Sequence, residues 1–244
     1  MFRALLVNNE NEKPRISEIS EDVLRKDGVL IKVEYSTLNY KDCLAILYGK
    51  PIIKKYPMIT GIDFCGTVLA DPSSQFKPGR KVLMTGFGMG EKFLGGHSQL
   101  ASVDASFLLD IPTGFTMKNA MQCGTAGLTA SMAVLKLKDF GLTPESGKIV
   151  VTGASGGVGT ISILLLKKLG FHVIGTTSSK KNIEFLENLG VHEIIETSTL
   201  SAAKILDQQR WIGAIDSLGS KALAGICAHT CAGGAVVACG NAQD

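Results

Sequence analysis

The stretch Val151-Thr152-Gly153-Ala154-Ser155-Gly156-Gly157-Val158-Gly159 decides the fold of this chain. It connects the apolar run Lys148–Thr152, which predicts a buried strand, to Gly157–Leu169, where apolar residues recur at helical spacing. A glycine-rich turn between a strand and a helix directs backbone N–H groups toward an anion, and a pyrophosphate fits there without a cation. The stretch therefore predicts a dinucleotide site, and a strand-to-helix turn without a ligand is the alternative.

The small residues of this stretch have different roles. Gly156 has no Cβ atom, so the backbone can approach the phosphates, and Gly159 lets the helix pack tightly on the strand. Ala154 stands where the strict pattern has its first glycine, so the turn must tolerate a methyl group there.

Strands and helices alternate around this turn in the second half of the chain. Such alternation implies crossover connections and a doubly wound parallel sheet, the Rossmann architecture. The other predicted strands are Phe171–Thr177, Glu193–Thr197, Ile212–Ser217 and Ala235–Cys239. The other predicted helices are Ala120–Leu137, Lys180–Leu189, Leu200–Gln208 and Lys221–Thr230.

The first half of the chain, residues 1–115, instead predicts short strands separated by turn formers, as in a small β-barrel or sandwich. The runs are Phe2–Val7, Val29–Tyr35, Thr67–Ala70, Lys81–Thr85 and Leu108–Ile111. We therefore expect an α/β protein with a β-barrel domain at residues 1–116 and a Rossmann domain at residues 117–244.

Composition excludes several classes of protein. Apolar residues make up 45% of the 244 residues and charged residues 19%, which indicates a globular chain and not a disordered one. A net charge of +3 gives no case for nucleic-acid binding. No apolar run is long enough to cross a membrane, and Met1–Val7 predicts a first strand and not a secretion signal. Scattered cysteines in apolar context predict a cytoplasmic protein.

The residues after the second Rossmann strand indicate which dinucleotide binds. NAD-binding folds place an acid about 20 residues after the glycines, where it holds the ribose 2′-hydroxyl. Here the strand ends in Thr176-Thr177-Ser178-Ser179-Lys180-Lys181, and the first acid is Glu184 in the next helix. Hydroxyls and an ammonium favour a 2′-phosphate, and therefore NADPH. An ordinary helix start with a serine cap and solvated lysines is the alternative.

Five motifs together resemble the medium-chain dehydrogenase/reductase superfamily, and within it the quinone-oxidoreductase-like branch that includes NADPH-dependent acryloyl-CoA reductases. Besides the glycine-rich turn, the matching stretches are Ser36–Asp42, Tyr56–Phe64, Thr85–Glu91, Gly124–Ala130 and Gly213–Asp216. The resemblance implies a GroES-like β-barrel before the Rossmann domain. It also implies a longer complete chain, so we expect the last part of the sheet and a returning segment to be missing. A homodimer is expected of the full-length protein.

The resemblance also argues against zinc. The positions of the catalytic zinc ligands in the alcohol dehydrogenases fall at Asn39, Ile62 and Thr125, and an amide, an alkyl group and a hydroxyl cannot replace thiolate and imidazole. The four-cysteine lobe that holds a structural zinc is also missing. We therefore expect no metal.

By resemblance, Asn39 and Tyr40 lie near the nicotinamide, and we expect Tyr40 to orient the ring or substrate and to donate or relay a proton. A tyrosine at a strand end that packs the domain interface is the alternative. Asp42 and Asp63 support this pair or form buried structural hydrogen bonds. The remaining cofactor positions implied by the resemblance are Ser155, Gly156, Gly157, Val158, Thr177, Ser178, Ser179, Lys180, Thr197 and Asn241.

Chemistry without a metal favours one type of acceptor. Hydride addition to a simple carbonyl leaves an alkoxide, whereas addition to an activated double bond leaves an enolate that hydrogen-bond donors can hold. We therefore expect an NADPH-dependent reductase of an α,β-unsaturated carbonyl or thioester, with acryloyl-CoA as the substrate implied by resemblance. A quinone reductase on the same scaffold is the first alternative, and a non-catalytic NADPH-binding protein is the second.

Three further patterns have less specific interpretations. One possible metal site consists of Cys227, His229 and Cys231. On the predicted helix, however, His229 lies about 200° from Cys227 and points away from it, which argues against a shared metal. The glycine pattern at 86–90 joins no strand to a helix and predicts a flexible loop. His97 is a candidate acid or base, and a partly buried histidine in a strand is the favoured interpretation.

Overall fold

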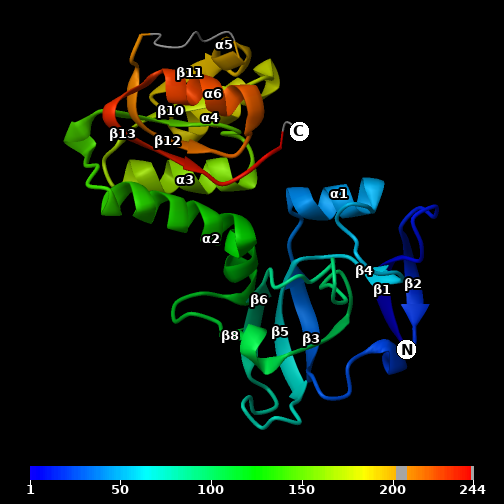
Figure 1. Cartoon of the computed structure of the whole chain (residues 1–244). Coiled ribbons are helices and arrows are strands. Elements are labelled where there is room, and N and C mark those ends of the chain that lie inside the picture. Colours follow the sequence, from blue (N-terminus) through cyan, green and yellow to red (C-terminus); the bar gives the residue numbers. More distant parts are fainter. Residues whose placement is uncertain (202–207, 243–244) are drawn as a thin grey trace. The chain divides into compact units, whose positions relative to one another are not determined.

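The computed structural model describes residues 1–201 and 208–242. Its contacts divide the chain into two units, Met1–Thr125 and Ala126–Asp244, which are coloured from blue to green and from green to red in Figure 1. The boundary expected between residues 116 and 117 stays a prediction. Within the described residues, no helix has the length and apolar character that crossing a membrane requires.

Two antiparallel sheets build the first unit. The smaller one has the order β2-β1-β4, and the larger one the order β7-β3-β5-β6-β8. The strands are β1 (Phe2–Val7), β2 (Arg15–Ile19), β3 (Val29–Ser36), β4 (Met58–Ile59), β5 (Asp63–Ala70), β6 (Lys81–Thr85), β7 (Leu100–Val103) and β8 (Leu109–Asp110). The five predicted runs are confirmed as strands: β1 and β6 have the predicted bounds, β3 and β8 differ by one residue at an end or at both ends, and β5 starts four residues earlier. The short strands β2, β4 and β7 were not predicted.

The strand-like interpretation of residues 1–115 is wrong at one place, because α1 (Tyr40–Tyr48) is a helix. Asn39 is its N-cap, and the Asp42 carboxylate accepts a hydrogen bond from the Asn39 backbone N–H at 2.8 Å, as in a capping box. Gly49 ends the helix with φ of 66°, a conformation that suits a residue without a side chain. The unit also contains the 3₁₀ turns η1 (Glu21–Val23) and η2 (Ala105–Phe107) and the start of α2 (Met117–Asp139).

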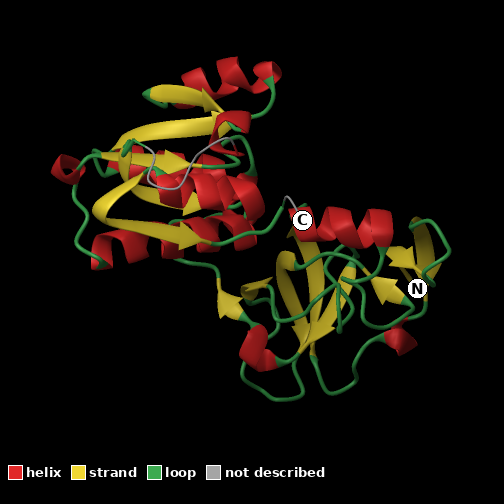
Figure 2. Cartoon of the chain, turned by 45° about the horizontal axis from the view of Figure 1, so that its top comes forward, coloured by secondary structure: helices red, strands yellow, loops and turns green. Residues whose placement is uncertain are grey.

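A five-stranded parallel sheet with the order β11-β10-β9-β12-β13 forms the second unit, as predicted. Figure 2 shows helices on both faces of this sheet. The strands are β9 (Lys148–Val151), β10 (His172–Thr177), β11 (Glu193–Glu196), β12 (Trp211–Asp216) and β13 (Thr230–Ala238). The helical segments are η3 (Pro144–Ser146), α3 (Gly157–Lys168), η4 (Lys180–Asn182), α4 (Ile183–Leu189), α5 (Ser198–Ser201) and α6 (Ser220–Ala228).

The central strand β9 explains why the sheet is covered on both faces. Ile149 and Val151 belong to one apolar cluster with α3, and Val150 belongs to another with α6, and all three are fully buried. A fully apolar strand has no face for solvent, so helices must pack on both sides. The strand order reverses at β9, and ligands bind at this kind of switch point in open parallel sheets.

Four predicted elements need correction or lie partly outside the described residues. Helix α6 ends at Ala228, so the predicted helix Lys221–Thr230 is too long, and β13 begins at Thr230 and not at Ala235. The predicted helix Leu200–Gln208 falls mainly on residues 202–207, outside the described residues. The predicted helix Ala120–Leu137 is α2 (Met117–Asp139), which is interrupted by non-helical angles at Gly124.

Candidate functional site

The glycine-rich turn lies where β9 ends and α3 begins, as the sequence predicts. Gly153 has φ of 55°, which turns the chain sharply after the strand. A Cβ atom at Gly159 would come within 2.3 Å of the Gly153 carbonyl oxygen, so only glycine lets α3 start this close to the turn. Ser155, Gly156 and Gly157 are exposed.

This geometry suits an anion. The first N–H groups of α3 have no acceptor inside the helix, and they lie at the exposed end of a segment of 12 residues. Gly156 is the N-cap and brings no side chain that would cover them. The methyl group of Ala154 is fully buried, and Gly175 on β10 leaves room for it. The turn therefore tolerates the Ala154 methyl group, as expected, because the neighbouring strand has a glycine, Gly175, beside it.

Buried polar contacts fix the base of the turn. The Thr152 hydroxyl donates to Asp216 Oδ1 at 2.6 Å and accepts from the Ser217 backbone N–H at 3.0 Å. Asp216 Oδ2 accepts from the Gly219 N–H at 2.8 Å. These bonds tie the end of β9 to the end of β12, and they add to the bond from the Gly156 N–H to the Gly153 carbonyl at 2.9 Å inside the turn.

A second segment, residues 177–182, follows β10 beside this turn. The Thr177 hydroxyl accepts from the Ser179 N–H and donates to the Ser179 carbonyl, both at 3.2 Å. Ser178 and Lys180 are exposed, while Ser179 is half-buried. This closed segment therefore exposes the side chains of Ser178 and Lys180 and leaves part of Ser179 accessible to a ligand.

The two remaining predicted cofactor positions of this unit differ in accessibility. Thr197 is buried and donates to the Thr176 hydroxyl at 3.2 Å, so its hydroxyl serves the sheet. Asn241 is exposed after β13, beside Gly219. Glu196, the last residue of β11, pairs in register with Thr177 and is exposed. The sequence reasoning missed this acid, because only parallel pairing places it beside the end of β10.

In the first unit, a buried carboxylate organises the residues expected at the reaction centre. Asp63 is fully buried, and its Oδ2 accepts from the Thr37 hydroxyl at 2.8 Å and from Asn39 Nδ2 at 2.9 Å. The Thr125 backbone N–H donates to Oδ2 at 2.8 Å, and the Thr125 hydroxyl donates to Oδ1 at 2.5 Å. A buried carboxylate is satisfied here by neutral donors.

The break in α2 makes this arrangement possible. Gly124 has φ of 49° and ψ of −154°, so the Thr125 N–H leaves the helical hydrogen-bond pattern and meets Asp63. A Cβ atom at Gly124 would lie 2.7 Å from Asp63 Oδ2. Sequence periodicity predicts the helix but not the break.

Hydrogen bonds fix the orientation of the Asn39 amide. Its Nδ2 donates to Thr37 Oγ1 at 2.6 Å and to Asp63 Oδ2 at 2.9 Å, with Asp42 Oδ2 at 3.3 Å. An amide nitrogen has two hydrogens, so both are used inside the protein. The group that Asn39 can offer to a ligand is its carbonyl oxygen, an acceptor.

Tyr40 is the first residue of α1 and is 57% exposed. The alternative interpretation as a tyrosine at a strand end is therefore wrong about the element. Asp42 is 1% exposed, and its Oδ1 accepts from the Ile62 N–H at 2.9 Å, which ties the start of α1 to the residues before β5. The position of Tyr40 is thus set by the capped first turn.

The expected zinc positions do not fit a zinc ion. The Asn39 amide and the Thr125 hydroxyl both direct hydrogens at Asp63, and Ile62 is a buried alkyl side chain. Zinc needs lone pairs from sulfur, imidazole or carboxylate ligands at such positions. Across residues 1–201 and 208–242, no group of three histidine, cysteine or acidic side chains is arranged to hold a metal.

Two other predicted candidates have structural partners. His97 lies in a bend and not in a strand, and its ring nitrogens contact the Thr37 carbonyl at 2.8 Å and the Thr60 hydroxyl at 2.9 Å. Since a carbonyl only accepts, Nε2 carries the hydrogen, and both nitrogens are occupied. The glycine pattern at 86–90 is a loop after β6, as predicted.

The cysteines near α6 do not share a helix face, because Cys227 is on α6 whereas Cys231 is on β13. His229 is the C-cap of α6, and its Nδ1 contacts the Gln208 carbonyl at 2.9 Å. A cavity of about 610 Å³ between α1 and residues 9–14 is lined by none of the predicted site residues.

Comparison with known proteins identifies the family. Residues 25–113 match the alcohol dehydrogenase GroES-like domain, and residues 157–244 match the zinc-binding dehydrogenase domain. The chain belongs to the medium-chain dehydrogenase/reductase superfamily and is an oxidoreductase of that superfamily. The predicted architecture, a GroES-like domain with a Rossmann domain, is confirmed.

Three relatives are particularly informative. The chain is 41% identical to the probable acrylyl-CoA reductase AcuI of Escherichia coli, over 99% of this chain and 75% of that protein. It is 40% identical to the putative quinone oxidoreductase YhfP of Bacillus subtilis, over 98% of this chain and 74% of that protein. A structure of YhfP has NAD bound and superposes with a TM-score of 0.93. The yhdH oxidoreductase from Salmonella enterica, in complex with NADP, is 40% identical over 100% of this chain and 75% of that one, with a TM-score of 0.94.

Proposed function

We propose that this chain is an NADPH-dependent reductase that adds hydride to the double bond of an α,β-unsaturated thioester, with acryloyl-CoA as the substrate and propionyl-CoA as the product. The observation that carries the proposal is the set of hydrogen bonds around Asp63. At the positions where a relative would hold a catalytic zinc, this chain uses its donors internally. A reaction that needs no Lewis acid at these positions, and that takes its hydrogen-bond donor from a neighbouring side chain, fits this centre.

The dinucleotide binds, in this proposal, against the start of α3. The backbone N–H groups of Gly157 and Val158, at the start of α3, hold the pyrophosphate together with Ser155, because they lack helical acceptors. Gly156, whose own N–H donates to the Gly153 carbonyl at 2.9 Å, has no side chain and lets the phosphates approach the backbone. Ser178, Ser179 and Lys180 hold the 2′-phosphate, and Thr177 supports them from the end of β10. Asn241 contributes near the nicotinamide from the end of β13. Thr197 supports the sheet and not the ligand directly, because its hydroxyl is already bonded to Thr176.

Support for NADPH over NADH comes from the Salmonella relative with NADP and from the hydroxyl and ammonium groups after β10. The YhfP relative with NAD and the exposed Glu196 beside Thr177 favour NADH. Glu196 belongs to the neighbouring strand, whereas the serines and Lys180 lie on the segment that directly follows β10. We therefore assign NADPH as the preferred cofactor.

Tyr40 is the donor at the reaction centre in this proposal, and Asn39 is an acceptor. Both amide hydrogens of Asn39 are directed at Thr37 and Asp63, so Asn39 cannot stabilise a developing oxyanion. The Tyr40 phenol, exposed at the start of α1, donates to the substrate carbonyl oxygen as negative charge develops on it. The dinucleotide, when bound, would supply the hydride to the β carbon, and the enolate then takes a proton from solvent at its α carbon, which completes the saturated thioester.

Quinone reduction on the same residues is the second candidate, and the similarity to YhfP favours it. A quinone also accepts hydride and develops charge on a carbonyl oxygen, so Tyr40 would have the same role.

The homodimer expected of the full-length protein stays a prediction, which light scattering of the purified protein would test.

An isotope experiment separates the candidates. The protein is mixed with NADPH deuterated at the hydride position and with either acryloyl-CoA or a quinone, and label transfer is followed by mass spectrometry. We expect deuterium in propionyl-CoA. Transfer to the quinone alone would replace the thioester with the second candidate. Tight NADPH binding without transfer to either acceptor would indicate a binding protein, and no binding would overturn the proposal.

A further inference from the structure

One side chain joins the two segments that we assign to the dinucleotide phosphates. Asn182 Nδ2 donates to Ser155 Oγ at 2.9 Å, which links η4 to the glycine-rich turn. The same nitrogen lies 3.5 Å from the Thr177 hydroxyl. Among the described residues, no other side-chain hydrogen bond connects residues 153–158 with residues 177–182.

The backbone of Asn182 is itself fixed to the segment after β10. Its N–H donates to the Ser179 carbonyl at 3.0 Å, and the Lys181 N–H donates to Ser179 Oγ at 3.4 Å. Because Ser179 is also bonded to the Thr177 hydroxyl, residues 177–182 form one closed unit. The hydrogen bond from Asn182 to Ser155 therefore fixes the position of the whole segment that carries Ser178 and Lys180.

The spacing between the two segments matters for a ligand with two phosphate groups on one ribose. The 5′-phosphate belongs at the turn and the 2′-phosphate belongs at Ser178 and Lys180, and the ribose between them has a fixed length. A segment held at the right distance loses little freedom on binding, which increases affinity without a new contact. The same side chains on a segment without this hydrogen bond would lose more conformational entropy on binding.

We propose that Asn182 is a positioning residue that selects dinucleotides with a 2′-phosphate, by holding the Ser178–Lys180 segment at the distance from Ser155 that such a ligand requires. This inference rests on the proposed function, because it assumes that the turn and this segment bind one ligand. Asn182 acts through Ser155 and does not itself hold the phosphate.

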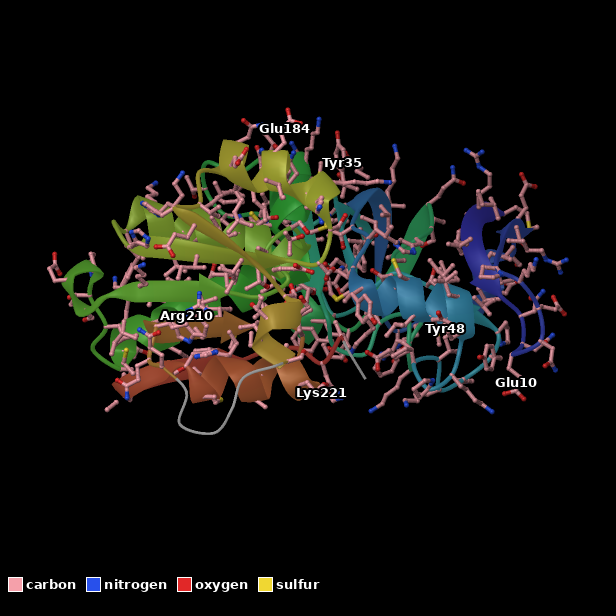
Figure 3. All side chains as sticks on the ribbon, turned by 90° about the horizontal axis from the view of Figure 1, so that it is seen from above. Glu10, Tyr35, Tyr48, Glu184, Arg210 and Lys221 are labelled. Atoms are coloured by element: carbon pink, nitrogen blue, oxygen red, sulfur yellow. The ribbon has the colours of Figure 1, made fainter. Side chains whose placement is uncertain are left out.

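Charges around this bridge fit the assignment. Lys180 and Lys181 are exposed on the same short segment, and neither forms an ion pair with an acid among the described residues. Glu184 lies in the first turn of α4, and Figure 3 shows its side chain at the outer edge of the molecule. An exposed acid on α4 is screened by solvent, so the bridge and not Glu184 decides whether the lysine can meet a 2′-phosphate.

The test uses two small probes on the whole chain, 2′,5′-ADP and 5′-AMP, which differ by the 2′-phosphate alone. Their dissociation constants are measured by calorimetry for the wild type, Asn182→Ala, Ser155→Ala and the double variant. Asn188→Ala serves as the control, because it removes an exposed asparagine side chain from α4, outside the segment assigned to the 2′-phosphate, and both affinities should stay unchanged. The unfolding midpoint of each variant, followed by the fluorescence of the single tryptophan, shows whether it is folded.

We expect Asn182→Ala to bind 2′,5′-ADP about 10-fold more weakly and 5′-AMP less than about 2-fold more weakly. In the Ser155→Ala background, the same change should cost less than about 3-fold, because the bridge is already broken. An unchanged affinity for 2′,5′-ADP in Asn182→Ala, or fully additive effects, would overturn the inference alone. A wild type that binds 2′,5′-ADP no more tightly than 5′-AMP would overturn the proposed cofactor and the inference with it.

Discussion

Asn39 and Tyr40 are neighbours in the sequence but have opposite hydrogen-bonding roles. Sequence reasoning places both near the reacting atoms without separating them. The structure uses both amide hydrogens of Asn39 internally, so the donor role falls to the Tyr40 phenol in our proposal. The orientation of the Asn39 amide therefore decides which residue of the pair can donate a hydrogen bond to a substrate. Substitutions at each residue test this assignment.

Substitution of Tyr40 by phenylalanine removes the proposed donor and keeps the ring. We expect kcat for acryloyl-CoA to fall about 100-fold, while the dissociation constant of NADPH changes less than about 5-fold. Tyr48→Phe is the matched control, because Tyr48 is an exposed tyrosine at the other end of the same helix (Figure 3). Equal activity of Tyr40→Phe and Tyr48→Phe in steady-state assays would remove Tyr40 from the mechanism.

Ser178 is exposed at the proposed 2′-phosphate position, and Ser178→Asp places a negative charge there. We expect the Michaelis constant for NADPH to rise about 10–100-fold through repulsion and the loss of a charge-assisted hydrogen bond. The constant for NADH should change far less, and Ser178→Ala should fall between the wild type and the aspartate variant. Equal effects on both dinucleotides in the same assay would count against a 2′-phosphate at this position.

Cys65 connects burial with the pH dependence of stability. Burial raises the pKa of the Cys65 thiol to about 11, and the thiol donates to the Met117 carbonyl. In the unfolded chain a cysteine titrates near pH 8.5, so above that pH the unfolded state loses its proton first and becomes favoured. The contribution of Cys65 is complete below pH 8.5 and is lost as pH rises toward 11.

We expect the stability difference between the wild type and Cys65→Ala to shrink by about 3 kcal/mol between pH 8 and pH 11. Urea unfolding at several pH values measures this difference. Cys227 is exposed, so Cys227→Ala should leave the pH dependence of the wild type unchanged. Parallel curves for the wild type and Cys65→Ala would mean that the folded thiol titrates normally.

Helices α1 and α2 differ in how far local sequence determines them. The cap residues of α1 are visible in the sequence, yet the short β-branched runs around them predict strands. In α2 the periodicity is clear, but the break at Gly124 serves a contact with Asp63, which is 61 residues earlier in the chain (124 − 63). A distant partner of this kind leaves no local signal.

Gly124→Ala tests the break in α2. A Cβ atom there would be 2.7 Å from Asp63 Oδ2 on a backbone with φ of 49°, so we expect a loss of about 2–4 kcal/mol of stability. Gly114→Ala is the control, because Gly114 has φ of 86° but open space around it, and it should lose only about 1 kcal/mol. Equal losses in urea unfolding would show that the contact with Asp63 adds nothing.

Each of the two units has its own apolar core. A ligand that binds one unit is therefore expected to raise the unfolding midpoint of that unit. The single tryptophan, Trp211, is buried in the second unit, so its fluorescence reports the unfolding of that unit. The first unit has its own buried cluster around Phe64 and Ile31. Circular dichroism follows both units, so the two signals together distinguish them.

We expect 2′,5′-ADP at 100 times its dissociation constant to stabilise the second unit by about 2.7 kcal/mol, seen as a higher midpoint in tryptophan fluorescence. The ligand contacts that we propose for this probe lie in the second unit. Ile163→Val, in the core of that unit, should lower the same midpoint with and without the probe. An unchanged fluorescence midpoint at saturating probe would place its site elsewhere.

The sequence by itself determined the parallel sheet, the turn between β9 and α3 and the family, because these depend on local periodicity and on residues close together in the chain. A fully apolar strand and a glycine-rich turn are each visible within about ten residues. The tertiary structure decided how distant residues act together: Asp63 with Asn39 and Thr125, Glu196 beside Thr177, and Asn182 with Ser155. Hydrogen bonds extend only a few ångströms, so their partners are known only when the folded backbone brings them together.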